Sequence, residues 1–111
     1  MIKFKKVNIL GVPYTVKTPT QVVLAELAGD QHTIGLCDDL EDIIYIASEL
    51  KGRAEKKTFI HEWAHGVKGV MGLNQTLDSR TAEILCQSFA NAFLELLDQP
   101  EVKKYLLQKH T

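Results

Sequence analysis

The sequence has few of the residues and segments that mark several large classes of protein. Only two of its 111 residues are cysteines, which is too few for a disulfide framework. No segment comes near the roughly 20 apolar residues that a membrane-spanning helix needs. Acidic and basic residues nearly balance, to a formal net charge of −1, and no basic run occurs. We therefore expect neither a membrane span nor direct electrostatic binding to nucleic acid.

The length and composition are those of an ordinary globular domain. The chain is 45% hydrophobic and 24% charged, so we expect one domain over residues 1–111. The first six residues lack the apolar stretch of a signal peptide and alternate like a strand, which favours a cytoplasmic location. Cys37 and Cys86 are expected to be small buried groups rather than metal ligands.

Apolar alternation predicts strands within about residues 2–47. The candidate strands cover residues 2–9, 12–16, 33–37 and 43–47, and they form a small antiparallel sheet. Gly11 suits the turn of a hairpin, and Pro13 predicts that the second strand lies at a sheet edge.

The first half of the chain also predicts one short helix and one acidic turn. Thr18 and Pro19 are typical of a helix start, and the helix should reach Ala28 and end at Gly29. The acidic segment 38–42 lacks the pattern of a calcium loop and is expected to be a solvated turn.

The second half of the chain predicts helices over about residues 54–67, 79–97 and 100–108. Glycines at 66, 69 and 72 should end the first of them, and Asp78 and Ser79 are good N-caps for the second. Strands followed by helices favour an α+β fold. Apolar residues three and four positions apart predict the core face of the second helix, at Leu85, Phe89, Ala92, Phe93, Leu96 and Leu97.

The first of these helices carries an H-E-x-x-H motif at residues 61–65. Residues four apart project from the same helical face, so His61 and His65 can bind a single ion. Glu62 lies beside them, where its carboxylate can reach a water on that ion. The flanking residues 58–60 and 66–67 are uncharged, as a helix packed in a core requires. This pattern is typical of a zinc peptidase.

A catalytic zinc site needs a third protein ligand, and Glu83 is the first choice. It lies on the expected second long helix, 18 residues after His65, and a loop of a dozen or so residues lets the two helices pack together. Gln87 and Asn91 continue a polar line at intervals of four. Four competing ligands stay open at this stage: Asp78, His32, Cys86 and His110.

The chemistry that such a site predicts is hydrolysis with one Zn²⁺ per chain. The ion lowers the pKa of its bound water and polarises the scissile carbonyl, while Glu62 takes the proton of that water and passes it to the leaving amine. The residue that stabilises the oxyanion is not defined by the sequence, and Tyr45, Tyr105 and His32 are the candidates.

The segment 58–67, followed by Glu83 on an apolar helix, resembles the small ImmA/IrrE-like metallopeptidases of phages, prophages and mobile elements. Residues 35–38 and 43–46 resemble the strands of that family's minimal domain, so the likeness covers most of residues 2–97. The resemblance implies a minimal zincin-like peptidase with His61, His65 and Glu83 as zinc ligands and Glu62 as the base. It also implies a peptide or protein substrate, such as a separate transcriptional repressor.

Two other interpretations of the same residues belong to different classes. A non-catalytic module could keep the metal for stability or for a regulatory interaction in a phage or mobile element. A metal-free helical interaction protein would carry its histidines incidentally. Glu62 argues against the first, because a structural metal site has no use for that carboxylate.

Overall fold

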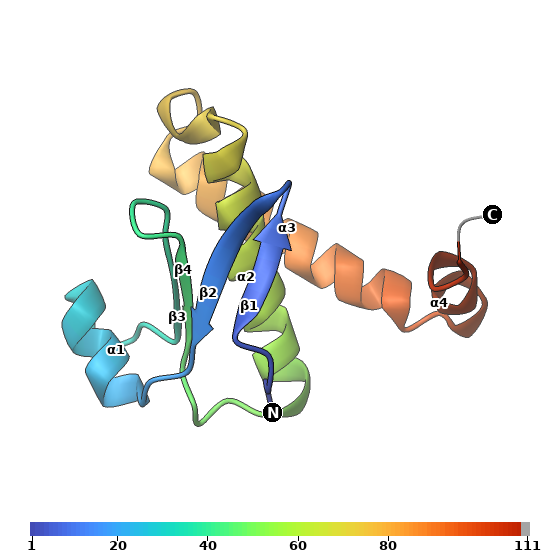
Figure 1. Ribbon diagram of the computed structural model, residues 1–111, viewed down its shortest axis with the longest axis horizontal. Coiled ribbons are helices and arrows are strands. Elements are labelled where there is room, and N and C mark those ends of the chain that lie inside the picture. The colour runs from blue at the N-terminus through green and yellow to red at the C-terminus, as the bar shows by residue number, and fades with distance from the viewer. Residues whose placement is uncertain (110–111) are drawn as a thin grey trace.

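The computed structural model describes residues 1–109, and within them a four-stranded sheet accompanies four α-helices (Figure 1). The predicted α+β class is confirmed. The strands are β1 (Lys6–Ile9), β2 (Val12–Lys17), β3 (Gly35–Asp38) and β4 (Ile43–Ile46). The helices are α1 (Gln21–Ala28), α2 (Gly52–Val70), α3 (Ser79–Leu97) and α4 (Pro100–Leu106), with a 3-10 turn η1 (Leu73–Gln75) between α2 and α3.

The sheet is mixed, so the prediction of an antiparallel sheet is wrong. Its strand order is β1-β2-β4-β3. The β1–β2 and β3–β4 pairs are antiparallel, but β2 and β4 are parallel. A parallel pair needs a long crossover connection, and here α1 and β3 lie between the two strands in the chain. Strand β3 is last in the strand order, so it is an edge strand.

Strand β2 is internal to the sheet, so the inference from Pro13 to an edge strand is also wrong. Pro13 pairs with Asn8 of β1, whereas β4 pairs with β2 only from Thr15 to Lys17. At Pro13 the side of β2 that faces β4 has no neighbouring strand. The missing N–H therefore costs no ladder hydrogen bond on that side.

The short helix α1 has the predicted end but a different start. Thr20 is its N-cap, and its side chain accepts a hydrogen bond from the backbone N–H of Val23. Thr18 and Pro19 precede the cap. Gly29 closes the helix with a φ of 72°, a conformation that costs glycine little.

The core lies between the sheet and α2. Its buried centre consists of Ile9, Tyr14, Ile44 and Ile46, and Phe59, Trp63, Val67 and Val70 of α2 pack against it. Helix α2 continues past Gly66 and Gly69, which were predicted to end it, and stops at Val70, before Gly72. Gly66 is buried in the helix, where an added Cβ would lie 2.5 Å from Cδ1 of Ile9. This glycine therefore permits a close approach of helix and sheet instead of ending the helix.

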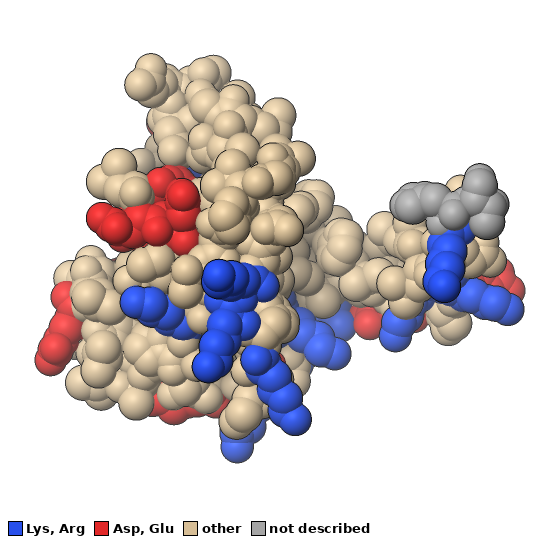
Figure 2. Space-filling view, viewed as in Figure 1, with Lys and Arg blue, Asp and Glu red and all other residues tan. Residues whose placement is uncertain are grey.

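The acidic turn 38–42 is only partly solvated. Asp39 accepts hydrogen bonds from the hydroxyl of Tyr14 (2.9 Å), the thiol of Cys37 (3.4 Å) and the side-chain amide of Asn74 (3.3 Å). Figure 2 shows acidic side chains gathered where Figure 1 places the β3–β4 turn. Asp39 thus ties the turn to β2 and to η1, which precedes α3.

Helix α3 runs antiparallel to α2 and packs closely on it. Asp78 is its N-cap as predicted, and the carboxylate accepts a hydrogen bond from the N–H of Thr81 (2.7 Å). The predicted core face of this helix is wrong. The buried residues of α3 are Ala82, Cys86, Ala90 and Leu94, and the first three of these have small side chains. Leu85 and Phe89 are about half exposed, because small residues bring the two helices closer than leucine and phenylalanine would permit.

Helix α4 projects from the end of α3 away from the sheet (Figure 1). It contains no buried residue. The Cα radius of gyration, 14.4 Å, exceeds the roughly 13 Å expected of a compact domain of this size. Within residues 1–109, no helix is both long enough and apolar enough to cross a membrane.

The packing of Gly66 on Ile9 makes a testable prediction. Gly66→Ala gains about 1 kcal/mol of helix propensity but overpacks the core at a cost of about 1–3 kcal/mol. We expect a net loss in the free energy of unfolding, measured by urea denaturation.

The combination with Ile9→Val isolates the contact. This substitution removes the methyl group that the new Cβ meets, at a cost of about 0.5–1.5 kcal/mol by itself. The double variant should therefore be more stable than the sum of the two single losses predicts. Additive losses would show that the two groups do not compete for space.

Candidate metal centre

The side chains of His61, His65 and Glu83 meet between α2 and α3. His61 and His65 lie one turn apart on α2, and Glu83 comes from the second turn of α3. One possible ligand atom from each of the three lies within 4.8 Å of the other two. Among residues 1–109, this is the one group of at least three such side chains that could hold a metal ion.

The separations between these ligand atoms suit a zinc ion. The Nε2 atoms of the two histidines are 3.2 Å apart, and Nε2 of His61 is 3.1 Å from Oε2 of Glu83. Two ligands about 2.0–2.1 Å from a tetrahedral zinc ion are ~3.3 Å apart. The contact between Nε2 of His65 and Oε1 of Glu83 is shorter, 2.6 Å, as expected of a direct hydrogen bond. Glu83 is 60% exposed at its side chain, so it has room to move outward around an ion.

Gln87 orients His61 from the next turn of α3. The Nδ1–H of His61 donates to Oε1 of Gln87 over 2.9 Å. This bond fixes the tautomer, so the lone pair of Nε2 points toward His65 and Glu83. Histidine ligands of metals are generally held by such a bond from their second nitrogen.

The electrostatics of the cluster favour a neutral His65 beside an ionised Glu83. Burial, helped by His61 and Lys68, lowers the pKa of His65 against the opposing effect of the Glu83 carboxylate, so this imidazole is neutral near pH 7. Burial raises the pKa of Glu83, but the neighbouring His61 and His65 outweigh this effect and leave that pKa below its usual value. Neutral imidazole and ionised carboxylate are the protonation states that bind a metal.

Glu62 lies next to the cluster on the side of α2 that faces the sheet. It is only 8% exposed, and burial, followed by the charge of Glu83, raises its pKa to about 8. Gly35 of β3 makes room for it. A Cβ at Gly35 would lie 2.9 Å from Oε2 of Glu62 and 2.7 Å from Cγ2 of Thr58. The carboxylate is therefore held close to the edge strand of the sheet.

A cleft of about 550 Å³ joins these groups. Glu62, His61 and Glu83 line it on one side, and the end of the α1–β3 loop and the start of β3 line it on the other. The remaining residues that line it come from both walls: Asp30, Thr33, Ile34, Gly35, Ala54, Lys57, Thr58 and Gln87. A buried carboxylate, three possible metal ligands and an open cleft together form a site at which a bound molecule could react.

The competing ligands that the structure describes lie elsewhere. Asp78 caps α3, and His32 is exposed in the loop before β3, in contact with Gln31. Cys86 is buried, and its pKa is raised to about 11, mainly by burial, so it is a thiol and not a thiolate ligand. Both cysteines are free, as expected. His110 lies outside the described residues.

None of the three candidate oxyanion residues lines the cleft. Tyr45 lies on β4, Tyr105 is 72% exposed on the projecting α4, and His32 lies in the loop before β3. The sequence placed Gln87 on a polar line with Asn91 but gave it no role at the site. The helical repeat could have predicted its contact with His61. If His65 faces Glu83 across two antiparallel helices, then His61, one turn earlier on α2, faces Gln87, one turn later on α3.

Searches against protein-family models, curated proteins and solved structures found no significant match to this chain. What the site can do is therefore argued from its geometry.

The contact between Gln87 and His61 predicts an effect on metal affinity. Gln87→Leu removes the acceptor and frees the orientation of the imidazole, so zinc affinity should fall by about 10–100-fold. Competition with a chromophoric chelator measures it.

Asn91→Leu is the matched control, because Asn91 continues the polar line on α3 one turn further and lies outside the cleft and the cluster. We expect no change in affinity for this variant. Equal losses in the two variants would show that Gln87 acts through the stability of α3 and not through His61.

Proposed function

We propose that this protein is a zinc-dependent peptidase that binds one Zn²⁺ per chain through His61, His65 and Glu83, with Glu62 as the general base. One observation carries the proposal. Two imidazole nitrogens and a carboxylate oxygen converge within 4.8 Å of one another, beside a cleft that His61, Glu83 and the buried Glu62 line.

The donor set fits zinc. Two histidines and one carboxylate leave a coordination position open, whereas structural zinc sites are usually closed and rich in cysteine. When bound, the ion supplies a Lewis acid that lowers the pKa of water and polarises a carbonyl group. The exposed side of the cluster, at Glu83, leaves space for such a group to enter.

Glu62 serves as the group that moves the proton. A bound cation would lower the pKa of Glu62 from about 8 and favour its carboxylate, which would accept a proton from the attacking water and return it to the nitrogen of the leaving amine. Gly35 supports this role, because the absence of a side chain there lets the carboxylate lie against β3. Thr58, one turn earlier on α2, packs against the same glycine beside Glu62.

The proposed substrate is a peptide or an extended segment of a protein. The volume of the cleft is typical of sites for small ligands, so it accepts a few residues and not a folded domain. We further propose a relationship to the small ImmA/IrrE-like metallopeptidases, with a separate repressor as one candidate substrate. The motif at 61–65 and the position of Glu83 support this relationship.

Two substitutions test the proposal because they separate metal binding from proton transfer. Glu62→Gln should retain about one zinc per chain and lose hydrolysis by at least 100-fold, since general base catalysis contributes roughly 10²–10⁴-fold. His65→Ala should lose both the zinc and the hydrolysis. Elemental analysis and mass spectrometry of a digested peptide library measure the two properties.

The outcomes distinguish the alternatives. Zinc in the wild-type protein without cleavage of any peptide would favour the non-catalytic, metal-stabilised module. No zinc, and no rise in melting temperature when zinc is added, would favour the metal-free interaction protein, because a ligand of the folded state must stabilise it. Hydrolysis retained in Glu62→Gln would contradict the proposed mechanism.

A further inference from the structure

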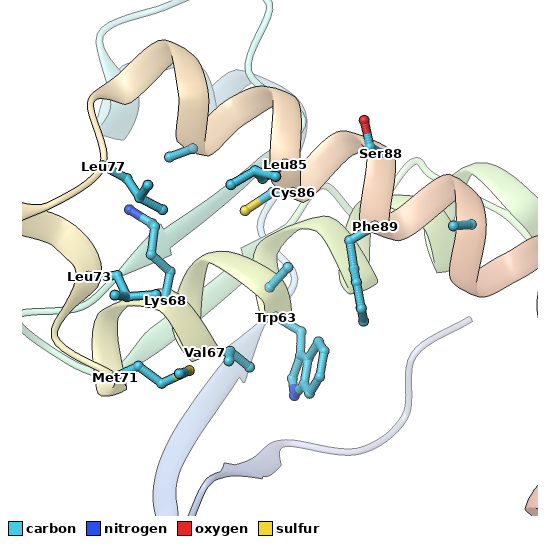
Figure 3. Close-up of a pocket in the computed structure, with 13 residues that line it drawn as sticks. Trp63, Val67, Lys68, Met71, Leu73, Leu77, Leu85, Cys86, Ser88 and Phe89 are labelled. Atoms are coloured by element: carbon cyan, nitrogen blue, oxygen red, sulfur yellow. The ribbon is translucent and has the colours of Figure 1, made fainter.

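An open apolar groove of about 580 Å³ runs between α2 and α3, and it shares no lining residue with the cleft at the metal centre. Figure 3 shows side chains from both helices and from the connection between them pointing into it. Trp63 and Val67 form one wall, Leu73 and Leu77 form one end, and Phe89 belongs to the other wall. A water-exposed groove of this kind is typical of a surface that another polypeptide covers.

The wall on α3 belongs to a continuous apolar stripe. Leu85, Phe89, Ala92 and Leu96 follow one another at intervals of three and four, so they share one side of the helix. All four are exposed, although their spacing is that of a buried face. Ser88 and Ala92 are small and lie near the middle of α3, where they allow a second helix to approach closely.

Within residues 1–109, helix α4 is the second element whose apolar side chains stay exposed. A seven-residue helix has little stability of its own in water, and nothing in α4 is buried. Its apolar residues Val102, Tyr105 and Leu106 follow the i, i+3, i+4 pattern with which a helix binds in a groove. The same chain therefore carries both an open apolar groove and an exposed helix of the kind that fits one.

We propose that two copies of this chain form a symmetric dimer through α3, with α4 of each copy seated at the groove of the other. A two-fold axis near Ser88 and Phe89, the middle of α3, places the two α3 helices antiparallel. The end of each α3 then lies beside the start of its partner. This position brings α4 to the end of the groove that Leu73 and Leu77 form.

The exposed apolar surface is large enough for such a dimer. Seven large apolar residues contribute, and together they expose as much surface as about 3.8 fully exposed residues. At about 200 Å² for each fully exposed residue, this is roughly 750 Å² per copy. A specific interface of standard size buries about 800 Å² on each partner. The contributing residues are Met71, Leu85, Phe89, Leu96, Tyr105, Leu106 and Leu107.

The dimer leaves the metal centre accessible. Glu83 and Gln87 face α2 from the side of α3 that lines the cleft, whereas Leu85 and Phe89 line the groove. Dimer formation is therefore expected whether or not the protein proves to be a peptidase.

Sedimentation velocity over a concentration series tests the dimer, with a matched pair of variants. Leu85 and Ile84 are adjacent on α3 and nearly equally exposed, at 52% and 56%, but only Leu85 lines the groove. Leu85→Glu should raise the dimer dissociation constant by at least about 30-fold, as loss of a central interface residue does. Ile84→Glu should leave it within a few-fold of wild type. Circular dichroism checks that both variants keep the fold, which is expected because both side chains are exposed.

A variant in α4 tests separately whether this helix binds at the groove of the other copy. Leu106→Glu should also weaken the dimer by about 10-fold or more. A wild-type chain that stays monomeric up to high micromolar concentration would overturn the proposal and leave the groove to a different partner. Equal effects of Leu85→Glu and Ile84→Glu would overturn it too, because the interface would then not follow the stripe. A dimer that Leu106→Glu leaves intact would overturn the placement of α4.

Discussion

The close packing of α3 on α2 is the constraint on which the candidate metal centre depends. Ala82, Cys86 and Ala90 form the contact face of α3, and their small size keeps the two helices near enough for Glu83 to reach His65. A bulky residue at any of these positions would separate the helices and move the carboxylate away. The same closeness brings Gln87 to His61, so ligand and positioning residue depend on a single helix pair.

The packing also explains why much of the apolar surface of α3 is left exposed. When alanines and a cysteine take the contact face, the leucines and the phenylalanine must lie on another side of the helix. This arrangement places Leu85 and Phe89 along the groove. A closely packed helix pair that carries the candidate metal ligands and an apolar surface available to a second copy are thus two consequences of one distribution of small and large residues.

Much of the fold could be predicted because it depends on local chemistry. Asp78 and Gly29 set the limits of α3 and α1 through hydrogen bonds and dihedral angles within a few residues, and both were predicted from the sequence. The errors concern contacts between distant segments. The role of Gly66 depends on Ile9 across the core, and the place of β2 within the sheet depends on pairing with a strand that begins 26 residues after β2 ends.

The same distinction holds at the site. The helical repeat alone predicts that His61 and His65 share a face, and the length of the connection makes Glu83 a reasonable partner. The contact between Gln87 and His61 follows from the helical repeat only once Glu83 is placed opposite His65, because that pairing fixes the rotation of α3 about its axis. The apolar spacing favoured the wrong face of α3, because the pattern of large residues alone did not show that small residues would make the contact.

X-ray absorption at the zinc edge, on the protein loaded with one equivalent of zinc, tests the central claim most directly. The predicted spectrum shows only nitrogen and oxygen ligands at about 2.0–2.1 Å, with the outer-shell scattering of two imidazole rings. In Glu83→Gln the two imidazoles should remain while the affinity for zinc falls. A sulfur ligand near 2.3 Å, or fewer than two imidazoles, would contradict the assignment of His61, His65 and Glu83 as the metal site.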